Sequence, residues 1–475
     1  MAEVQISGDD ENVEVLFDED NNVMSPADLP MEDNIPFGEN LAEYIDEGTL
    51  GQIASELESS YQDDVSSRQD WYETFRDGLE LLGIENEPRS EPFEGASGVF
   101  HPLLAEAATH FQAQAYKELL PANGPVDTKV IGASNNPKAM QANRVKDFMN
   151  YQLMYKMEEY DPEMDQMLFF LPLAGSAFKK CYFDPAMGRV VSRFIKAEDL
   201  VVPYTATDLH TTPRITHVIK MTENDMRKLQ LSGFYRDLDM MNPGYAPDEN
   251  AVQEKIDEIE GVSRTGNSEQ YTLLECHVEL DIEGFEHTDA SGEPTGLALP
   301  YIVTICQDNN KVLAIRQNYI ENDPMRKKIE YFTHYKFLPG LGFYGFGLIH
   351  MIGGVTKSAT AILRQLIDAG TLSNLPAGFK SRGLNIQRAD DPVQPGEWRD
   401  VDAPGGSLSQ SFMPLPYKEP SGTLAQLMGV LVESGQRFAA VMDQQTGDGN
   451  SQAPVGTTVA LLEKGQKVIS SIHKR

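Results

Sequence analysis

Apolar and polar residues alternate along the chain in two rhythms, one typical of helices and the other of strands. From Leu41 to Leu82 apolar side chains recur every three or four residues, which predicts a helical region with one buried face. The same spacing predicts helices over Val99–Leu120 and Lys138–Tyr160, and a short one over Thr222–Leu231 with Thr222 as its N-cap. The third helical region carries a stripe that we expect to be core, because methionines at helical spacing usually pack inside a protein: Met149, Leu153, Met154 and Met157.

Strand-like spacing dominates the middle of the chain. Ala177–Pro203 predicts a hairpin, because two β-type runs flank a turn that contains proline and glycine. Tyr271–Phe285 and Tyr301–Tyr319 are two longer β-type runs joined by a loop rich in glycine and acidic residues. We interpret Cys276 and His277 as a buried thiol beside a solvent-facing imidazole. Helices and strands together predict an α+β body.

The most distinctive pattern is a glycine-rich turn that leads into a long, nearly uncharged segment. A strand-like run, Tyr331–Phe337, precedes three glycines with the spacing G-x-G-x-x-G, namely Gly340, Gly342 and Gly345. Phe346–Gly370 then predicts a helix of about 38 Å, with Gly370 as its C-cap. Its full charges are few: Lys357, Arg364 and Asp368. Such a helix is too apolar to be solvated on every side, which indicates helix–helix packing.

The glycine spacing also occurs in dinucleotide-binding folds, where small residues let backbone N–H groups approach a pyrophosphate. Here Phe343 and Tyr344 fill the space between the second and third glycines, and no second strand ending in an acidic residue follows. We therefore interpret the glycines as permitting a tight bend from strand to helix. In this interpretation Phe343, Tyr344 and Phe346 anchor the bend by packing.

The last hundred residues predict a protrusion between two helices. Asn374–Pro420 is a turn-rich β stretch, and a returning helix is predicted from Thr423 to about Met442 after Ser421. A polar, glycine-bearing loop, Gln444–Gly456, separates this helix from another helical pattern that continues to Arg475.

Composition narrows the classes of function. The chain has 475 residues and a formal net charge of -34, which does not suit tight, static binding of nucleic acid. From the charge alone we favour solubility as its role, and the alternative is a passage through which DNA slides without binding. Residues 1–38 are acidic and predict a mobile arm, which alternatively becomes ordered on a neighbouring subunit. Three scattered cysteines indicate reduced thiols, and we expect no secretory signal and no membrane span.

No motif for catalysis or metal binding stands out. The chain has no H-E-x-x-H, no G-x-S-x-G and no G-x-x-x-x-G-K-[ST]. His101 and His110 lie nine residues apart and do not share a helical turn, so we assign them to packing or solvent. We expect no catalytic, cofactor-binding or metal-ligating residues, and a protein that is not an enzyme.

Five collinear segments resemble the portal (head-to-tail connector) proteins of P22-like short-tailed bacteriophages. The central one contains the turn GFYGFGLIH and the helix end ILRQLIDAG within Tyr331–Gly370. The resemblance extends from about Asn40 to Arg475, and the other four segments are Ser67–Ile84, Ser97–Val126, Gly175–Tyr204 and Ala453–Arg475.

The resemblance implies a portal-type α+β fold within a ring-shaped homo-oligomer. The implied parts are an acidic arm (1–38), a wing (39–345), a first stem helix (346–372), a clip (373–420), a second stem helix (421–443), a tunnel loop (444–456) and the start of a spine helix (457–475). Because the chain stops in a helical pattern, we expect that the family's crown and barrel are not part of it.

The implied function is structural. A homo-dodecamer would occupy one vertex of the capsid, assemble in the host cytoplasm, and pass double-stranded DNA through its channel during packaging and ejection. The implied partners are the large terminase, the head-to-tail adaptor, and the major capsid and scaffolding proteins. Two alternatives stay open: another viral ring or connector protein, and a nucleotide-dependent enzyme that uses Gly340–Gly345.

The resemblance also suggests residues for each role. Gly340, Gly342, Gly345 and Gly347 would form the hinge from wing to stem. Lys357 and Arg364, seven residues apart on one helix face, would line the channel as basic rings or pair with carboxylates of a neighbour. The tunnel-loop candidates for contact with DNA are Gln444, Gln445, Thr446, Asp448, Asn450 and Gln452.

Overall fold

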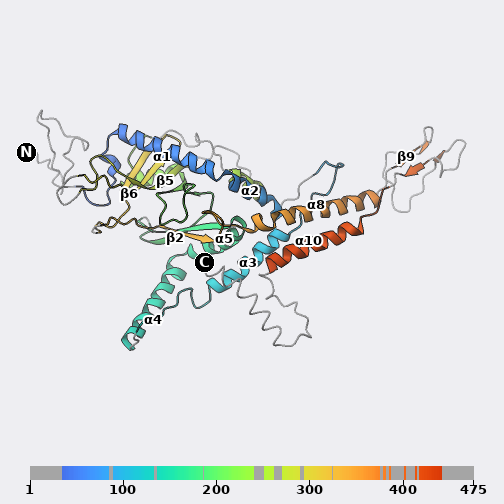
Figure 1. Ribbon diagram of the computed structural model, residues 1–475, viewed down its shortest axis with the longest axis horizontal. Coiled ribbons are helices and arrows are strands. Elements are labelled where there is room, and N and C mark those ends of the chain that lie inside the picture. Colours follow the sequence, from blue (N-terminus) through green and yellow to red (C-terminus); the bar gives the residue numbers. More distant parts are fainter. Residues whose placement is uncertain are drawn as a thin grey trace, which may run out of the picture. The chain divides into compact units, whose positions relative to one another are not determined.

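A computed structural model of the chain has mixed helices and strands, in agreement with the predicted α+β class (Figure 1). It describes residues 35–84, 89–132, 136–185, 187–239, 251–261, 270–288, 294–321, 323, 325–374, 378–380, 385–386, 401–402, 412–414 and 417–440. The chain divides into two compact units. Unit 1 comprises residues 1–79, 108–350 and 469–475, and unit 2 comprises residues 80–107 and 351–468.

Unit 1 contains a five-stranded antiparallel sheet in the order β3-β4-β5-β6-β7. Its strands are β3 (Leu200–Val201), β4 (Arg214–Thr222), β5 (Gln270–Leu280), β6 (Leu299–Cys306) and β7 (Lys311–Gln317). The prediction of a single β-type run over Tyr301–Tyr319 is therefore wrong. Polar turn residues divide it into a hairpin, and Asn310 takes a left-handed φ of 48° at the reversal.

Helix α1 (Glu47–Ser67) covers one face of this sheet. It buries Leu50, Ala54 and Leu57, spaced by four and three residues, against sheet residues that include Leu274 and Tyr301. Just before α1, the short 3₁₀ turn η2 (Leu41–Glu43) follows the buried Asn40. The Asn40 side-chain amide donates a hydrogen bond to the carbonyl of Leu313 at 3.0 Å and accepts one from the N–H of Ile315 at 3.0 Å. It therefore provides hydrogen-bond partners for the backbone at the outer edge of β7.

A three-stranded antiparallel sheet, β2-β1-β8, forms the other sheet of unit 1. The predicted hairpin is confirmed: β1 (Ser176–Asp184) pairs with β2 (Arg189–Ile195), and β8 (Phe332–Lys336) pairs with the other edge of β1. Helix α5 (Tyr160–Ala174), which the sequence pattern did not predict, packs on β1 and β2.

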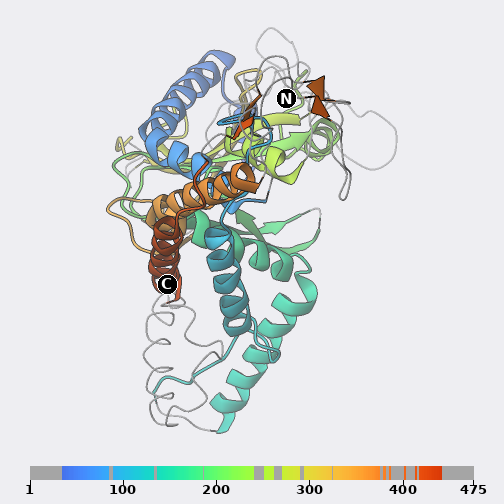
Figure 2. The same cartoon turned by 90° about the vertical axis from the view of Figure 1, so that its right-hand side faces the viewer.

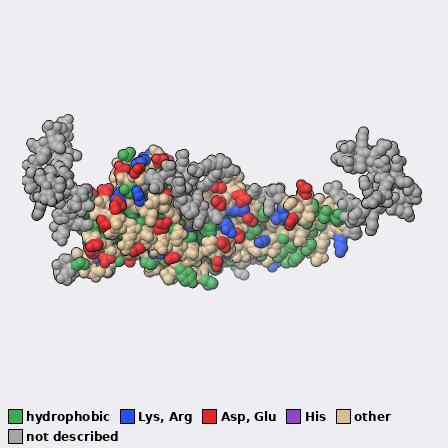
Figure 3. Space-filling model, turned by 90° about the horizontal axis from the view of Figure 1, so that it is seen from above, with side chains coloured by type: hydrophobic (Ala, Val, Ile, Leu, Met, Phe, Trp, Pro, Cys, Tyr) green, Lys and Arg blue, Asp and Glu red, His purple; other side chains and the backbone are tan. Residues whose placement is uncertain are grey.

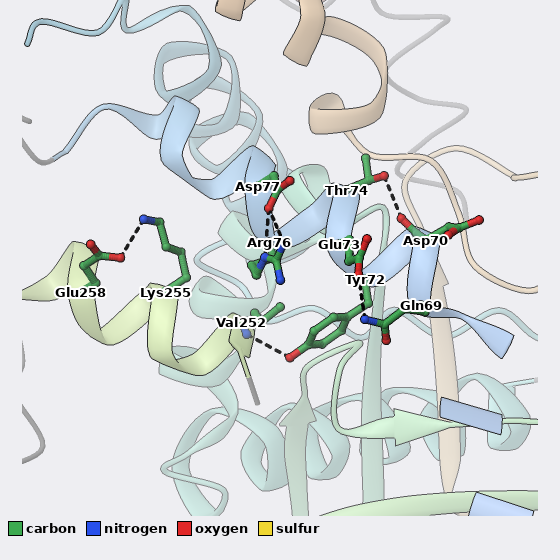
Figure 4. Close-up of polar contacts among 10 residues, drawn as sticks. All are labelled: Gln69, Asp70, Tyr72, Glu73, Thr74, Arg76, Asp77, Val252, Lys255 and Glu258. Atoms are coloured by element: carbon green, nitrogen blue, oxygen red, sulfur yellow. Dashed lines mark hydrogen bonds and ion pairs between the residues drawn. The ribbon is translucent and has the colours of Figure 1, made fainter. Parts of the chain in front are cut away.

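The other helices that precede α8 refine the sequence predictions. The region 41–82 is not continuous, because α1 and α2 (Gln69–Leu79) are separated at Arg68 before the short turn η3 (Glu80–Leu82). Helix α3 (Leu103–Leu119) and helix α6 (Glu223–Leu231) confirm two predictions, and the Thr222 hydroxyl accepts from the N–H of Asp225 as a helix cap. Helix α7 (Ala251–Glu260) lies beside α2, where the N–H of Val252 donates to the hydroxyl of Tyr72 at 2.9 Å (Figure 4).

The expectation of a methionine core in the third helical region is wrong. Helix α4 (Asn136–Tyr151), with its π-helical continuation Gln152–Lys156, has no buried residue. Met149 and Met154 are 41% and 36% exposed, and only Met157, after the π turn, is buried. Periodicity correctly predicted a helix but could not predict whether anything covers its apolar side.

Unit 2 contains most of the long apolar helix and its returning partner. Helix α8 (Leu348–Asn374) starts at the end of unit 1, and α10 (Gly422–Ala440) confirms the predicted returning helix. The prediction of Gly370 as a C-cap is wrong, because α8 continues four residues beyond it. Between the helices, β9 (Gly378–Lys380) pairs with β12 (Phe412–Pro414), and β10 (Asn385–Ile386) pairs with β11 (Val401–Asp402).

Some predictions fall on residues that the structure does not describe. These are the arm as far as residue 34, the tunnel loop 444–456 with its six candidate residues, and the helix predicted over 457–475. Among the described residues, none of the helices has the length and apolar character needed to cross a membrane.

Candidate functional site: the glycine turn and the helix that follows

The glycine turn lies directly against the end of helix α5. Gly175 ends α5 in the left-handed region at φ 84°, and its N–H donates to the carbonyl of Leu171 at 2.8 Å. A Cβ atom on Gly345 would lie 2.3 Å from the carbonyl oxygen of Gly175, and one on Gly347 would lie 2.1 Å from that of Leu173. These glycines therefore allow backbone to pack on backbone, which no residue with a side chain permits.

The other two predicted hinge glycines differ from each other. A Cβ atom on Gly340 would lie 2.2 Å from the carbonyl oxygen of Tyr344, within the turn itself. At Gly342 the added atom would have no neighbour within 4 Å. Close approach thus explains Gly340, Gly345 and Gly347, whereas Gly342 faces open space.

The backbone N–H groups that a phosphate would need are already engaged. Gly345 donates to the hydroxyl of Ser176 at 2.8 Å, Phe346 to the carbonyl of Leu338 at 3.0 Å, and Gly347 to the Nδ1 atom of His350 at 3.3 Å. In addition, β8 before the turn pairs antiparallel with β1, whereas a dinucleotide site requires parallel strands. The geometry describes a packed bend.

Aromatic side chains hold this bend in place, as predicted for Phe343 and Tyr344. Phe343 is buried and stacks on His334 with ring centroids 4.7 Å apart, and burial lowers the pKa of His334 to about 3. The Tyr344 ring stacks on Trp71 at 4.7 Å, and its hydroxyl donates to the carbonyl of Leu200 at 3.1 Å. Phe346 packs less closely: it is 39% exposed, and its ring centroid lies 5.9 Å from that of His350.

Sequence reasoning missed Arg68, which connects the bend to the rest of unit 1. Its guanidinium lies in the gap between α1 and α2 and is buried. It donates to four oxygens, those of the Ala197, Glu198 and Leu200 carbonyls and the Tyr344 hydroxyl. The signal in the sequence was its isolation, because Arg68 is the first basic residue of the chain.

Beside Arg68 lies a buried carboxylate that the sequence did not indicate. Neither side-chain oxygen of Glu198 accepts a hydrogen bond from another residue in the described part of the chain. Its nearest cation is Lys196, whose Nζ atom lies 3.9 Å away. Burial, and secondarily the charge of Asp199, raises the pKa of Glu198 to about 7.

The interpretation of His277 as solvent-facing is wrong, although Cys276 is buried as expected. The two sheets of unit 1 meet at Glu275, which accepts from Lys180 Nζ of β1 at 2.5 Å and lies 2.8 Å from His277 Nε2. Burial alone would raise the pKa of Glu275, but Lys180 and the neighbouring His217 and His277 hold it well below its ordinary value. Within the described ranges, no group of three or more His, Cys, Asp or Glu side chains could hold a metal ion.

In unit 2, a polar stripe of α8 binds the backbone of residues 97–101. Thr360, Arg364 and Asp368 are spaced four residues apart and so share one helix face. The Thr360 hydroxyl accepts from the N–H of His101 at 3.0 Å, and the Asp368 carboxylate accepts from the N–H of Ser97 at 2.7 Å.

Arg364 completes this stripe. It donates to the carbonyls of Val99 at 2.9 Å and Gly98 at 3.3 Å, and its guanidinium lies 4.3 Å from the ring centroid of Phe100. The structure thus engages Arg364 within its own subunit. Lys357, one turn before the stripe, is exposed.

Helices α8 and α10 also have exposed apolar side chains. On α10, Leu427 and Val430 are 47% and 62% exposed, and on α8 Ile367 is 39% exposed. Among the α10 residues whose burial is described, only Gly435 is buried, where an added Cβ would lie 2.5 Å from Leu103 Cδ2. The charges of α10 are Glu433 and Arg437, which pair with each other at 2.6 Å.

The described residues thus form an α+β body, a close-packed glycine bend and two helices with exposed apolar side chains. In a comparison with protein-family models, residues 184–447, more than half of the chain, match the model "Phage SU10 portal protein". The chain belongs to this family of phage portal proteins, which confirms the resemblance seen in the sequence. Comparison with curated proteins gives no match.

Proposed function

We propose that the chain forms a ring at one vertex of a phage capsid, through which double-stranded DNA enters during packaging and leaves during ejection. The observation that carries this proposal is the uncovered apolar surface of α10. A helix with two charged residues in 19, and with Leu427 and Val430 exposed, is unfavourable in water and is stabilised by another protein surface. In a ring, neighbouring copies supply that surface.

Electrostatics support a channel that does not retain DNA. With a net charge of -34 per chain, the protein repels a phosphate backbone. Figure 3 shows acidic side chains spread over one face of the molecule without gathering in one patch. Weak, sequence-independent contact by the loop 444–456, and by Lys357 as a ring of cations, is part of the proposal.

We further propose that residues 373–420, between the two stem helices, form the docking surface for the terminase and then for the tail adaptor. The support is their position between two helices and their two short antiparallel strand pairs. The turn at Gly340–Gly347 would direct the chain from the wing into the stem. What supports this part of the proposal is the close backbone packing of Gly345 and Gly347 against the end of α5.

Native mass spectrometry with end-on electron microscopy tests the proposal. We expect closed rings, and family membership leads us to expect twelve copies. A chain that stays monomeric at high concentration would contradict the ring, and an open stack or a ring of another geometry would favour a different connector. Titration with ATP, GTP and NAD should show no micromolar binding at the glycine turn.

A further inference from the structure

Helix α4 carries an exposed apolar stripe that the portal role does not explain. One side of α4 packs on residues 126–128 of the same unit: Asn150 Nδ2 donates to the carbonyl of Val126 at 3.0 Å, and Thr128 Oγ1 donates to that of Ala142 at 3.0 Å. Figures 1 and 2 show α4 (teal) extending away from the sheets of unit 1. On the opposite side of the helix, large apolar side chains of the described chain are exposed.

The exposed side of α4 carries four large apolar residues and one arginine at helical spacing. Its residues, which we call the α4 stripe, follow helical spacing: Met140, Arg144, Phe148, Tyr151 and Tyr155. The apolar members are 62%, 60%, 47% and 75% exposed in that order. Tyr151 and Tyr155 stack with centroids 6.0 Å apart, so they form one aromatic surface. Such a contiguous exposed patch marks a protein contact.

The stripe is also basic, in an otherwise acidic chain. Asn136–Lys156 contains four basic residues and one acidic residue, whereas the whole chain has a net charge of -34. Arg144 lies within the stripe, and the Nζ atom of Lys156 lies 5.8 Å from the ring centroid of Tyr151. Two copies of α4 would repel each other, and large apolar side chains do not suit a phosphate backbone. The expected occupant is an acidic peptide with apolar side chains.

The chain itself contains such a peptide. Residues 9–20 hold seven acidic residues and no basic one, and they surround a short apolar run: Val13, Val15, Leu16 and Phe17. We propose that residues 9–20 dock on the α4 stripe, with Phe17 and its neighbours on the aromatic surface and the carboxylates beside Arg144 and Lys156. Ile35, which packs on the core of unit 1, anchors the tether. The residues between 20 and 35 can span up to about 50 Å.

Carbodiimide cross-linking of the full chain, read by mass spectrometry, tests this contact directly. The reagent couples carboxylates to lysine amines in contact. Lys146 and Asp127, 2.8 Å apart on the packed side of α4, provide an internal positive control. We expect links from Lys156 to residues 9–20, and a mixture of isotopically light and heavy chains shows which copy supplies the segment. Links from Lys156 only to carboxylates outside residues 9–20 would overturn the proposal.

Hydrogen exchange of α4 provides a second, independent measurement. Neutralising six carboxylates, in the variant D9N/D10N/E11Q/D18N/E19Q/D20N, should speed exchange of the α4 amides several-fold at low salt. The matched control neutralises acidic residues outside the segment, in E3Q/D28N/E32Q/D33N, and should leave exchange unchanged. Equal exchange in the wild type and both variants would overturn the proposal. The proposed contact involves α4, whereas ring formation is argued from α10. A negative result for the α4 contact therefore does not contradict the ring, and the contact can still be tested in a chain that stays monomeric.

Discussion

At the scale of single residues, the pH dependence of stability depends on Glu198, which is buried beside Arg68. Burial and the neighbouring Asp199 raise its pKa from 4.5 to about 7, so between these pH values the folded chain binds more protons here than the unfolded chain does. Stability from this group is therefore complete below about pH 4.5 and is lost as the pH rises through 7. The loss is on the order of 3 kcal/mol.

Replacing Glu198 by glutamine should remove the part of the pH dependence that Glu198 contributes, while Asp199, whose pKa burial also raises, keeps a part of its own. We expect the E198Q variant to gain stability over the wild type at pH 8 and to match it closely at pH 4.5, because glutamine is always neutral. Urea midpoints at the two pH values measure the effect. The substitution Glu260→Gln, at an exposed position on α7, serves as a control and should keep the wild-type difference between the two urea midpoints. If E198Q also keeps that difference, the pH dependence of stability comes from another group.

The glycines of the bend allow a matched pair of substitutions. Gly345→Ala places a Cβ atom 2.3 Å from the carbonyl oxygen of Gly175 and 2.7 Å from that of Leu338, and both are backbone atoms that cannot rotate away. We expect a loss of about 1–3 kcal/mol or more in the free energy of unfolding. Gly342→Ala meets no atom within 4 Å and should be neutral or stabilising. Similar midpoints for both variants would show that the turn is not close-packed.

At the scale of elements, α8 holds residues 97–101 through side chains on one face. Arg364→Ala removes two hydrogen bonds to carbonyl groups and the contact with Phe100, so we expect a loss of about 1–3 kcal/mol. Faster hydrogen exchange should appear at residues 97–101. Lys357→Ala, which changes an exposed cation on the same helix, should stay within about 0.5 kcal/mol of the wild type. If Lys357→Ala speeds hydrogen exchange at residues 97–101 as much as Arg364→Ala does, Arg364 does not position these residues.

How far the sequence predicted each element depends on whether the evidence was local. The β1–β2 hairpin and α10 were predictable, because turn residues and periodic apolar positions lie within each segment. The exposure of Met149 was not predictable, because burial depends on segments far away in the chain. The same reason hid the role of Gly345, which becomes clear only when Gly175 lies against it. Arg68 was overlooked because the hydrogen-bond partners of its guanidinium lie at least 129 residues away.

At the scale of the whole molecule, stability and assembly should respond to different residues. Most of the buried apolar side chains lie in unit 1, where α1 and the five-stranded sheet form one core. In contrast, α10 exposes Leu427 and Val430, which contribute little to the fold of an isolated chain. Substitutions on α10 should therefore abolish the proposed ring without unfolding the chain, and substitutions in the core should do both.

The double substitution Leu427→Asn and Val430→Asn tests this separation. It places two polar amides on a surface that we propose is buried between copies, where each unpaired amide costs about 1–3 kcal/mol, repeated at every interface. Native mass spectrometry should then show monomers, while circular dichroism and the urea midpoint stay at the values of the wild-type monomer. Ala425→Asn, at an exposed position on the opposite side of the same helix, is the matched control and should assemble normally. Rings of unchanged size in the double variant would mean that α10 faces solvent in the assembly, and the subunit contact would have to lie elsewhere.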